Sequence, residues 1–165
     1  MRRFAAVIAL ALLANPFHAS ARGWSTFRDP KMAFALQYPP GWKVSGTPAL
    51  GLVVLQSGTL SINVRMVPVR PGRNALQTAR AVARLDPALS RVQWTRTTLG
   101  GRPARAGVDS PPTEGGVSVS DGIYVVTWRR RVYEVIIASY HKPALKRLSQ
   151  FPAIYGQILR TWRFL

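Results

Sequence analysis

Two consecutive segments rich in β-branched and aromatic residues constrain the fold most. Residues 123–128 and 132–140 consist largely of Val, Ile, Tyr and Trp, and only Arg129, Arg130 and Arg131 separate them. Such side chains favour strands, and two strand segments joined by so short a connection are typical of a hairpin. The sequence therefore predicts a long antiparallel hairpin with the three arginines at its tip.

A third segment has the clearest alternation of apolar and polar residues in the chain. Between Leu60 and Val69, every second residue from Leu60 to Met66 is apolar, which places these side chains on one face of a strand. Gly100 and Gly101 are expected to form a tight turn. Shorter strands are expected at residues 24–29, 34–38, 42–44, 52–55, 92–97 and 103–108.

Two helices complete the expected secondary structure. Residues 75–85 repeat apolar residues at helical spacing, Asn74 can cap the first turn, and Pro87 marks the end. The residues after Pro143 suit an amphipathic helix, which Pro152 must kink or restart. This order of elements has no βαβ alternation, so it predicts an α+β fold with a mainly antiparallel sheet flanked by helices.

The N-terminus has the three-part layout of a secretory signal. Two arginines precede an apolar run at residues 4–14, and a pair of small residues in an A-x-A arrangement ends at Ala21. A helix needs about 20 residues to cross a bilayer, so this run is too short for an ordinary span. We expect residues 1–21 to be a cleaved signal and residues 22–165 to be a periplasmic or secreted domain without a membrane span. A buried N-terminal helix and an uncleaved anchor are the alternatives.

The chain contains no cysteine, which excludes disulfides and a lipid-modified cysteine at the cleavage site. Its stability must therefore come from a hydrophobic core, and residues 22–165 are enough for one basic domain. The chain has 23 Lys and Arg against six Asp and Glu, and removal of Arg2 and Arg3 lowers the formal charge from +17 to +15. Such a surface attracts polyanions without specific contacts, although a compositional preference for Arg would give the same excess.

Three groups of cations are candidates for binding an anionic partner. Adjacent guanidiniums at the hairpin tip can direct forked donors toward phosphates or carboxylates. Alternatively, a solvated charged tip keeps the hairpin edge from aggregating. The candidates are Arg129, Arg130 and Arg131 at the tip, Arg80 and Arg84 on one face of the first helix, and Lys142, Lys146 and Arg147 at the beginning of the last helix.

The sequence has little of the chemistry that enzymes use. His141 is the only His after the expected cleavage point, no Ser lies in a G-x-S-x-G elbow, and no phosphate-binding glycine motif is present. One His and six scattered acids do not make a zinc site, so we expect no catalytic residue, metal or cofactor. The alternative is a small extracytoplasmic hydrolase or ligand carrier with a pocket near residues 109–122, where Asp109, Glu114 or Asp121 would lie at the rim.

Four landmarks extend over nearly the whole chain after the expected signal. They are Phe34-x-x-x-Tyr38-Pro39-x-Gly41-Trp42, the turn Leu99-Gly100-Gly101-Arg102-Pro103-Ala104, a strand containing Tyr133, and the closing Ile158-Leu159-Arg160-Thr161-Trp162-Arg163-Phe164. Their order and spacing resemble those of PsbP-like domains. The family includes photosystem accessory proteins and bacterial exported proteins. The resemblance implies an α/β/α sandwich and an interaction role without catalysis. It assigns no catalytic residues, and this sequence has no acidic or His cluster to match the metal and subunit contacts of the photosystem members.

These observations predict an exported, non-enzymatic module that binds an envelope protein, or an anionic surface polymer or lipid, through a cationic face. The charge would suit nucleic acid equally well. The expected signal, however, places the protein where nucleic acid is scarce, so no nucleic-acid partner is expected.

Overall fold

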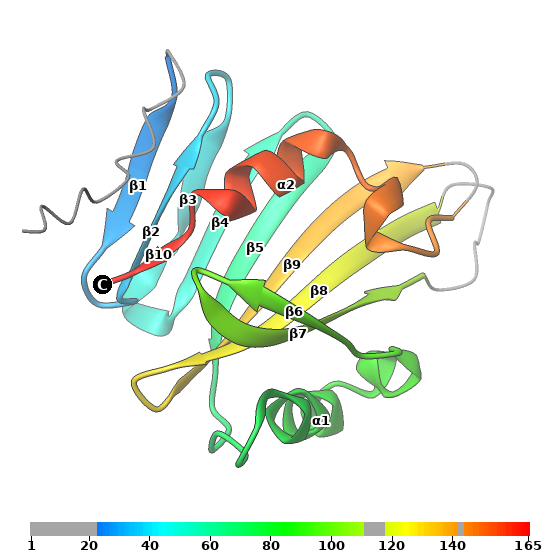
Figure 1. The fold of residues 1–165 in the computed structure, drawn as a ribbon. Helices are drawn as coiled ribbons and strands as arrows, with labels where there is room; N and C mark the ends of the chain where they lie inside the picture. Colours follow the sequence, from blue (N-terminus) through cyan, green and yellow to red (C-terminus); the bar gives the residue numbers. More distant parts are fainter. Residues whose placement is uncertain (1–22, 111–117, 142–143) are drawn as a thin grey trace, which may run out of the picture.

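The computed structural model describes residues 23–110, 118–141 and 144–165 (Figure 1). The expected signal at residues 1–21 and part of the 109–122 segment, residues 111–117, lie outside these ranges. The strands are β1 (Ser25–Asp29), β2 (Phe34–Tyr38), β3 (Lys43–Thr47), β4 (Leu52–Ser57), β5 (Leu60–Val67), β6 (Thr95–Leu99), β7 (Arg102–Asp109), β8 (Ser118–Trp128), β9 (Arg131–His141) and β10 (Arg163–Phe164). The α-helices are α1 (Ala75–Leu85) and α2 (Ala153–Arg160). Among the described residues, no helix is long and apolar enough to cross a membrane.

The strands form two antiparallel sheets. The larger has seven strands in the order β3-β4-β5-β9-β8-β7-β6, and the smaller has three in the order β1-β2-β10. The predicted hairpin is confirmed as β8 and β9, which pair along their whole length from Ser118 opposite His141 to Trp128 opposite Arg131. Both strands are longer than the apolar runs that predicted them, because β8 begins earlier, at Ser118, and β9 also includes Arg131 and His141.

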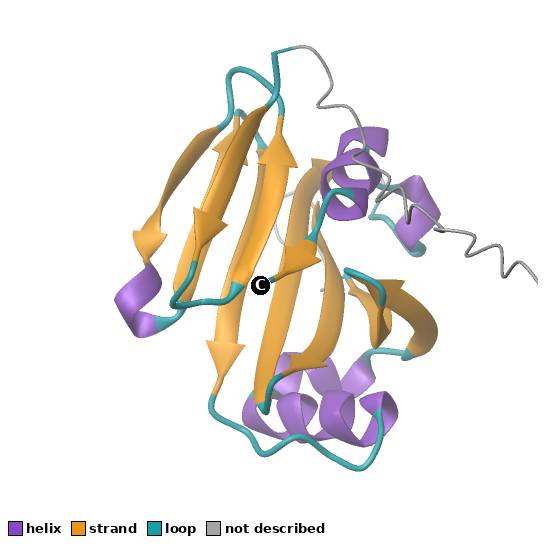
Figure 2. Cartoon of the chain, turned by 60° about the vertical axis from the view of Figure 1, so that its left-hand side comes forward, coloured by secondary structure: helices purple, strands orange, loops and turns teal. Residues whose placement is uncertain are grey.

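Two hydrophobic cores lie on opposite faces of the large sheet, and Figure 2 shows the helices that cover these faces. Alternation along β9 divides the side chains between them, since Tyr133 and Val135 face α2 and the small sheet, whereas Val132 and Ile136 face α1. Leu60, Ile62, Val64 and Met66 of β5 share the α2 side, as their alternation predicted. The result is the α+β sandwich expected from the sequence, with helices covering both faces of a mainly antiparallel sheet.

The first helix follows its sequence closely, and the second does not. Asn74 caps α1 by accepting a hydrogen bond from the Gln77 amide at 3.0 Å, as predicted. The helix expected after Pro143 is interrupted: a 3-10 turn spans Leu148–Gln150, and α2 starts only after Pro152, which restarts the chain as a helix. Lys146 and Arg147 therefore precede that turn and do not begin α2.

The strand expected from residue 92 also begins later than predicted. A second 3-10 helix spans Pro87–Arg91, with Asp86 as its cap, and β6 starts at Thr95. Val92 is buried against α1 without belonging to a strand. The apolar residues at 92 and 94 pack under α1. In the sequence, an alternation of only two apolar residues is too short to distinguish such packing from a strand.

Aromatic residues that are far apart in the sequence close the α2 side of the core. Phe34 stacks on Trp162 with ring centroids 4.3 Å apart and meets the edge of Tyr133 at 6.4 Å. Gly100 lies under the same cluster with a φ of +56°, and a Cβ there would approach Trp162 to 2.7 Å. The landmarks noted in the sequence thus contact one another, and the Gly100–Gly101 turn forms where it was predicted.

Candidate functional site

The turn between β8 and β9 consists of only two residues, Arg129 and Arg130. Both have positive φ, +45° and +65°, as two-residue turns of type I′ require. That conformation favours Asn and Gly, and it costs other residues roughly 1–2 kcal/mol each. The only other non-glycine residue with positive φ in the described part of the chain is Ala33. Arginine therefore occupies two adjacent positions where the backbone alone would select other residues.

Residues on either side of this turn hold the end of the hairpin against neighbouring segments. Arg131 is the first residue of β9 and donates a hydrogen bond to the Lys31 carbonyl, so it lies beside the turn, whereas the sequence placed all three arginines at the tip. Trp128 lies beneath, with the Arg102 guanidinium 4.1 Å and the Arg129 guanidinium 5.3 Å from its ring centroid. These distances are within the range of cation–π attraction.

Trp128 is itself held by the C-terminal strand. Its Nε1 donates to the Leu165 carbonyl at 3.2 Å, and its ring stacks on Phe164 with centroids 5.5 Å apart. We name the exposed arginines gathered around this tryptophan the cationic tip; they are Arg102, Arg129, Arg130 and Arg131. Arg102 comes from the neighbouring β6–β7 hairpin, and no local sequence pattern indicated it, because its proximity depends on the pairing of β7 with β8.

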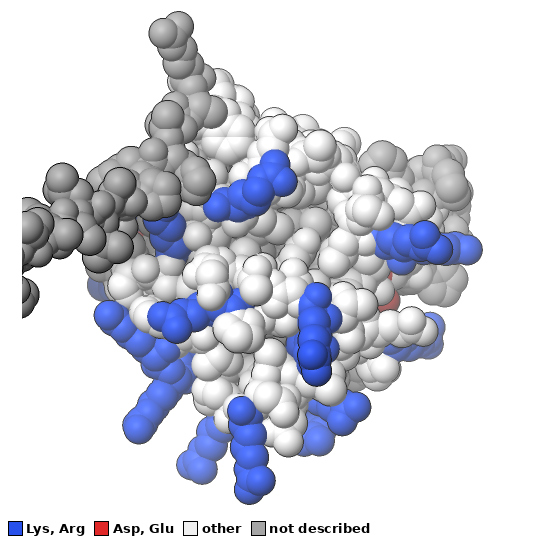
Figure 3. All heavy atoms as spheres, in the orientation of Figure 1, with Lys and Arg blue, Asp and Glu red and all other residues white. Residues whose placement is uncertain are grey.

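The cationic tip lacks carboxylate partners in the described part of the chain. There, Arg65 is the only cation in a salt bridge, to Asp86 and Glu134. Figure 3 shows Lys and Arg side chains over the visible face of the molecule and very little Asp or Glu. The guanidiniums of Arg102, Arg129 and Arg130 therefore have no carboxylate partner among the described residues, and that of Arg131 donates to the Lys31 carbonyl.

The remaining predicted cations lie elsewhere, so the structure does not gather all of them on one face. Arg80 and Arg84 are exposed on α1 and line a cavity of about 520 Å³ together with Leu76, Ala83, Leu89, Ser90, Val92 and Trp94. Lys146 and Arg147 line a second, larger cavity of about 940 Å³. Lys142 lies outside the described residues. The β8–β9 turn and the segment before α2 lie at opposite ends of the large sheet (Figure 1).

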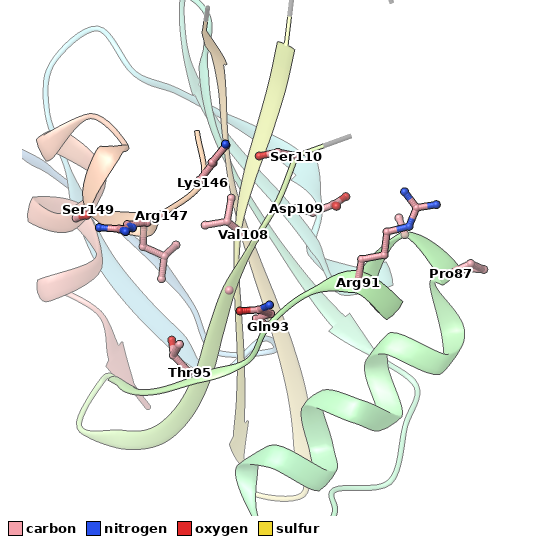
Figure 4. Close-up of a pocket in the computed structure, with 13 residues that line it drawn as sticks. Pro87, Arg91, Gln93, Thr95, Val108, Asp109, Ser110, Lys146, Arg147 and Ser149 are labelled. Atoms are coloured by element: carbon pink, nitrogen blue, oxygen red, sulfur yellow. The ribbon is translucent and has the colours of Figure 1, made fainter. Parts of the chain in front are cut away.

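The larger cavity has walls from three separate segments (Figure 4). Arg91, from the 3-10 helix after α1, stands on one side, Arg147 and Ser149 stand on the opposite side, and Asp109 of β7 lies between them. We name this cavity the β7 pocket. Sequence reasoning did not single out Arg91, because only the tertiary fold brings it opposite the residues near 147.

Two of the acids considered from the sequence form a cross-strand pair beside this pocket. Asp109 and Asp121 are directly opposite each other on β7 and β8, and of the two only Asp109 lines the pocket. Burial raises the pKa of Asp121 to about 6, and the charges of Asp109 and Glu134 contribute. Burial also raises the pKa of Asp109, while the charge of Arg91 opposes that shift. Glu114 lies outside the described residues.

These carboxylates offer limited chemistry in the described part of the chain. Within residues 23–110, 118–141 and 144–165, no three Asp, Glu, His or Cys side chains are grouped so that they could hold a metal ion. Double-displacement or inverting hydrolysis needs two carboxylates that face one ligand, and Asp109 faces the pocket without Asp121. Of the two carboxylates, only that of Asp109 is placed to contact a ligand in the pocket.

Comparison with known proteins identifies the fold. No family model matches the chain, and no curated protein is similar to it in sequence. Cyanobacterial PsbP (CyanoP) of Synechocystis superposes with a TM-score of 0.60 at 14% identity, over 93% of this chain and 99% of that protein. A protein of Bacteroides thetaiotaomicron superposes with a TM-score of 0.60 at 11% identity, over 88% of this chain but only 49% of its own length. The chain therefore has the PsbP-like fold that its sequence landmarks predicted.

Proposed function

We propose that this protein is an exported, non-enzymatic interaction module that binds an anionic partner through the cationic tip. The partner is an envelope protein or an anionic surface polymer or lipid. Export is part of the proposal and rests on the signal-like residues 1–21. The binding role rests on the arginines of the tip.

The backbone conformation of Arg129 and Arg130 is the observation that carries this proposal. A two-residue hairpin turn is commonly Asn-Gly or a similar pair, and two arginines with positive φ are less stable there by roughly 1–2 kcal/mol each. Strained residues that persist despite such a cost are concentrated at functional sites. The Arg129 guanidinium lies over the Trp128 ring, so it loses less side-chain entropy on binding an anion than a freely rotating arginine would.

The chemistry of the tip favours phosphate or carboxylate groups. Each guanidinium presents forked donors that match either group, and Arg102 and Arg129 are further ordered over the Trp128 ring. Because the tip contains four arginines without carboxylate partners in the described chain, it combines long-range attraction with specific contacts. A nonspecific charge effect would instead be shared by all the exposed cations.

The test separates the tip from the total charge of the protein. Arg129→Asn with Arg130→Gly removes two charges and supplies the preferred turn residues, while Arg80→Ala with Arg84→Ala removes two charges from α1. We expect the tip variant to bind immobilised poly-glutamate and phosphatidylglycerol vesicles at least tenfold more weakly than wild type, and the α1 variant to change binding less than threefold. Neutral phosphatidylcholine vesicles serve as the reference, and comparison of polymer with lipid identifies the source of the anion.

Stability provides an independent readout of the same variant. The Asn-Gly turn should raise the free energy of unfolding by about 2 kcal/mol, because it relieves two left-handed arginines. A variant that is more stable and binds less strongly is the expected outcome. Equal losses of binding in the tip and α1 variants would show that net charge alone is responsible, and the proposal would fail.

A further inference from the structure

The β7 pocket is a second cationic site, separate from the tip. β7 continues to Asp109 along β8, whereas its pairing with β6 ends at Ala106. The floor of the β7 pocket is therefore formed by the part of β7 that extends beyond its pairing with β6. Its neutral lining includes hydroxyl and amide groups together with apolar side chains, namely Gln93, Thr95, Ser110, Ser149, Val108 and Leu148.

The charges in the pocket are unbalanced. Among the described residues that line it, Arg91, Lys146 and Arg147 face a single carboxylate, that of Asp109. None of the three cations forms a salt bridge within the described residues. Arg91 is close enough to influence the ionisation of Asp109, so one cation is partly compensated. Lys146 and Arg147, which come from the segment before α2, therefore remain available to bind a ligand.

Hydrogen bonds hold the cationic wall in place without a ligand. The Gln150 side chain accepts from the backbone amides of Lys146 and Arg147, both at 2.8 Å. The fully buried hydroxyl of Ser120 accepts from the Leu145 amide at 2.8 Å, and Ser110 donates to the Leu145 carbonyl. These contacts join the wall to β8 and to the residue that follows β7.

We propose that the β7 pocket binds a small polyhydroxylated anion, a sugar-sized molecule that carries a carboxylate or a phosphate. Cations on two opposite walls can both approach the anionic group, and charge-assisted hydrogen bonds of this kind are the strongest that side chains form. Asp109, Gln93 and Thr95 supply acceptors and donors for hydroxyl groups. A cavity of about 940 Å³ has the dimensions of ordinary small-molecule sites.

Calorimetric titration of the whole protein tests this site. Glucose 6-phosphate, glucuronate and glucose serve as probes, so that the phosphate and carboxylate forms of the anion are compared with the same sugar lacking charge. We expect at least one of the two anions to bind and glucose not to bind. Which anion binds more tightly identifies the group that the cationic walls prefer.

Variants assign the binding to the pocket. Arg91→Ala and Lys146→Ala change exposed side chains, and each should weaken binding of the anion at least tenfold. Arg80→Ala with Arg84→Ala is the control and should leave the affinity within twofold of wild type. Asp109→Ala should reduce the preference for glucose 6-phosphate over inorganic phosphate, because it removes the carboxylate that accepts hydrogen bonds from hydroxyl groups.

Either of two results would overturn the proposal. One is the absence of binding by both anions at millimolar concentration, checked by amide chemical shifts of residues 107–109. The other is an equal loss of affinity in the pocket variants and in the α1 control, which would indicate general attraction to a cationic surface. The site does not depend on the cationic tip, so failure of one proposal leaves the other standing.

Discussion

At the scale of single residues, Glu134 of β9 is the only fully buried acidic residue in the described part of the chain. It is fully buried and lies directly opposite Arg65 of β5, whose Nε donates to its carboxylate. Its second oxygen has no hydrogen-bond partner within the described residues. The Arg65 side chain is 42% exposed and also reaches Asp86 at 3.5 Å. The buried carboxylate thus depends on a guanidinium that is itself half in water.

This asymmetry predicts unequal costs for removing the two partners. Arg65→Leu leaves an uncompensated buried carboxylate, and we expect a loss of about 3–5 kcal/mol in the free energy of unfolding at pH 7. Glu134→Leu leaves an arginine that reaches water and Asp86, so its cost should be smaller. Urea denaturation measures both losses.

Arg65→Lys provides the control. A lysine at this position keeps a cation opposite Glu134, so we expect it to lose less stability than Arg65→Leu does. Equal losses in Arg65→Leu and Glu134→Leu would contradict the dependence of Glu134 on Arg65.

At the scale of elements, β7 and β8 place two like charges directly opposite each other. Asp109 and Asp121 are cross-strand partners, and like charges in this position destabilise a sheet. The pKa of Asp121 is raised to about 6, mainly by burial, so the folded protein holds this proton at a higher pH than the unfolded chain does. The contribution of this proton to the stability of the fold is complete below about pH 4. It is lost as the pH rises through 6.

Replacing Asp121 with Asn should therefore stabilise the protein at neutral pH. We expect a gain of about 1 kcal/mol at pH 7, because the variant carries neither the buried charge nor the repulsion. The gain should disappear near pH 4, where the wild-type carboxyl is protonated. Thermal unfolding across this pH range measures it, and a gain that is the same at pH 4 and pH 7 would show that packing, not charge, is responsible.

The elements also show what the sequence could predict and where it failed. The β8–β9 hairpin, the Asn74 cap and the Gly100–Gly101 turn follow local rules, so residues close in sequence were sufficient to predict them. The late start of β6 was missed because Val92 is apolar for packing under α1. The assembly of the sites was not predictable, since Arg102 and Arg91 reach them through contacts between distant segments.

At the scale of the whole molecule, the two proposed sites lie at different points along the same strand, β8. Asp121 lies opposite the pocket residue Asp109, and β8 then continues to Trp128 at the cationic tip. Seven residues of strand span about 23 Å, well beyond the Debye length of roughly 8 Å at physiological salt. The strands between the sites are paired on both sides, so neither site requires the other to be ordered.

This separation predicts that the two sites act independently. We expect Arg129→Asn with Arg130→Gly to leave the affinity for glucose 6-phosphate within twofold of wild type, and Arg91→Ala to leave binding of phosphatidylglycerol vesicles equally unaffected. Combining all three substitutions should then reproduce each separate loss, because distant sites without shared partners behave additively. The same titrations at 50 and 300 mM salt provide the check. If the sites influence each other at low salt and not at high salt, the cause is the shared charge of the molecule; an influence that persists at high salt would require a conformational link through β8 and β9.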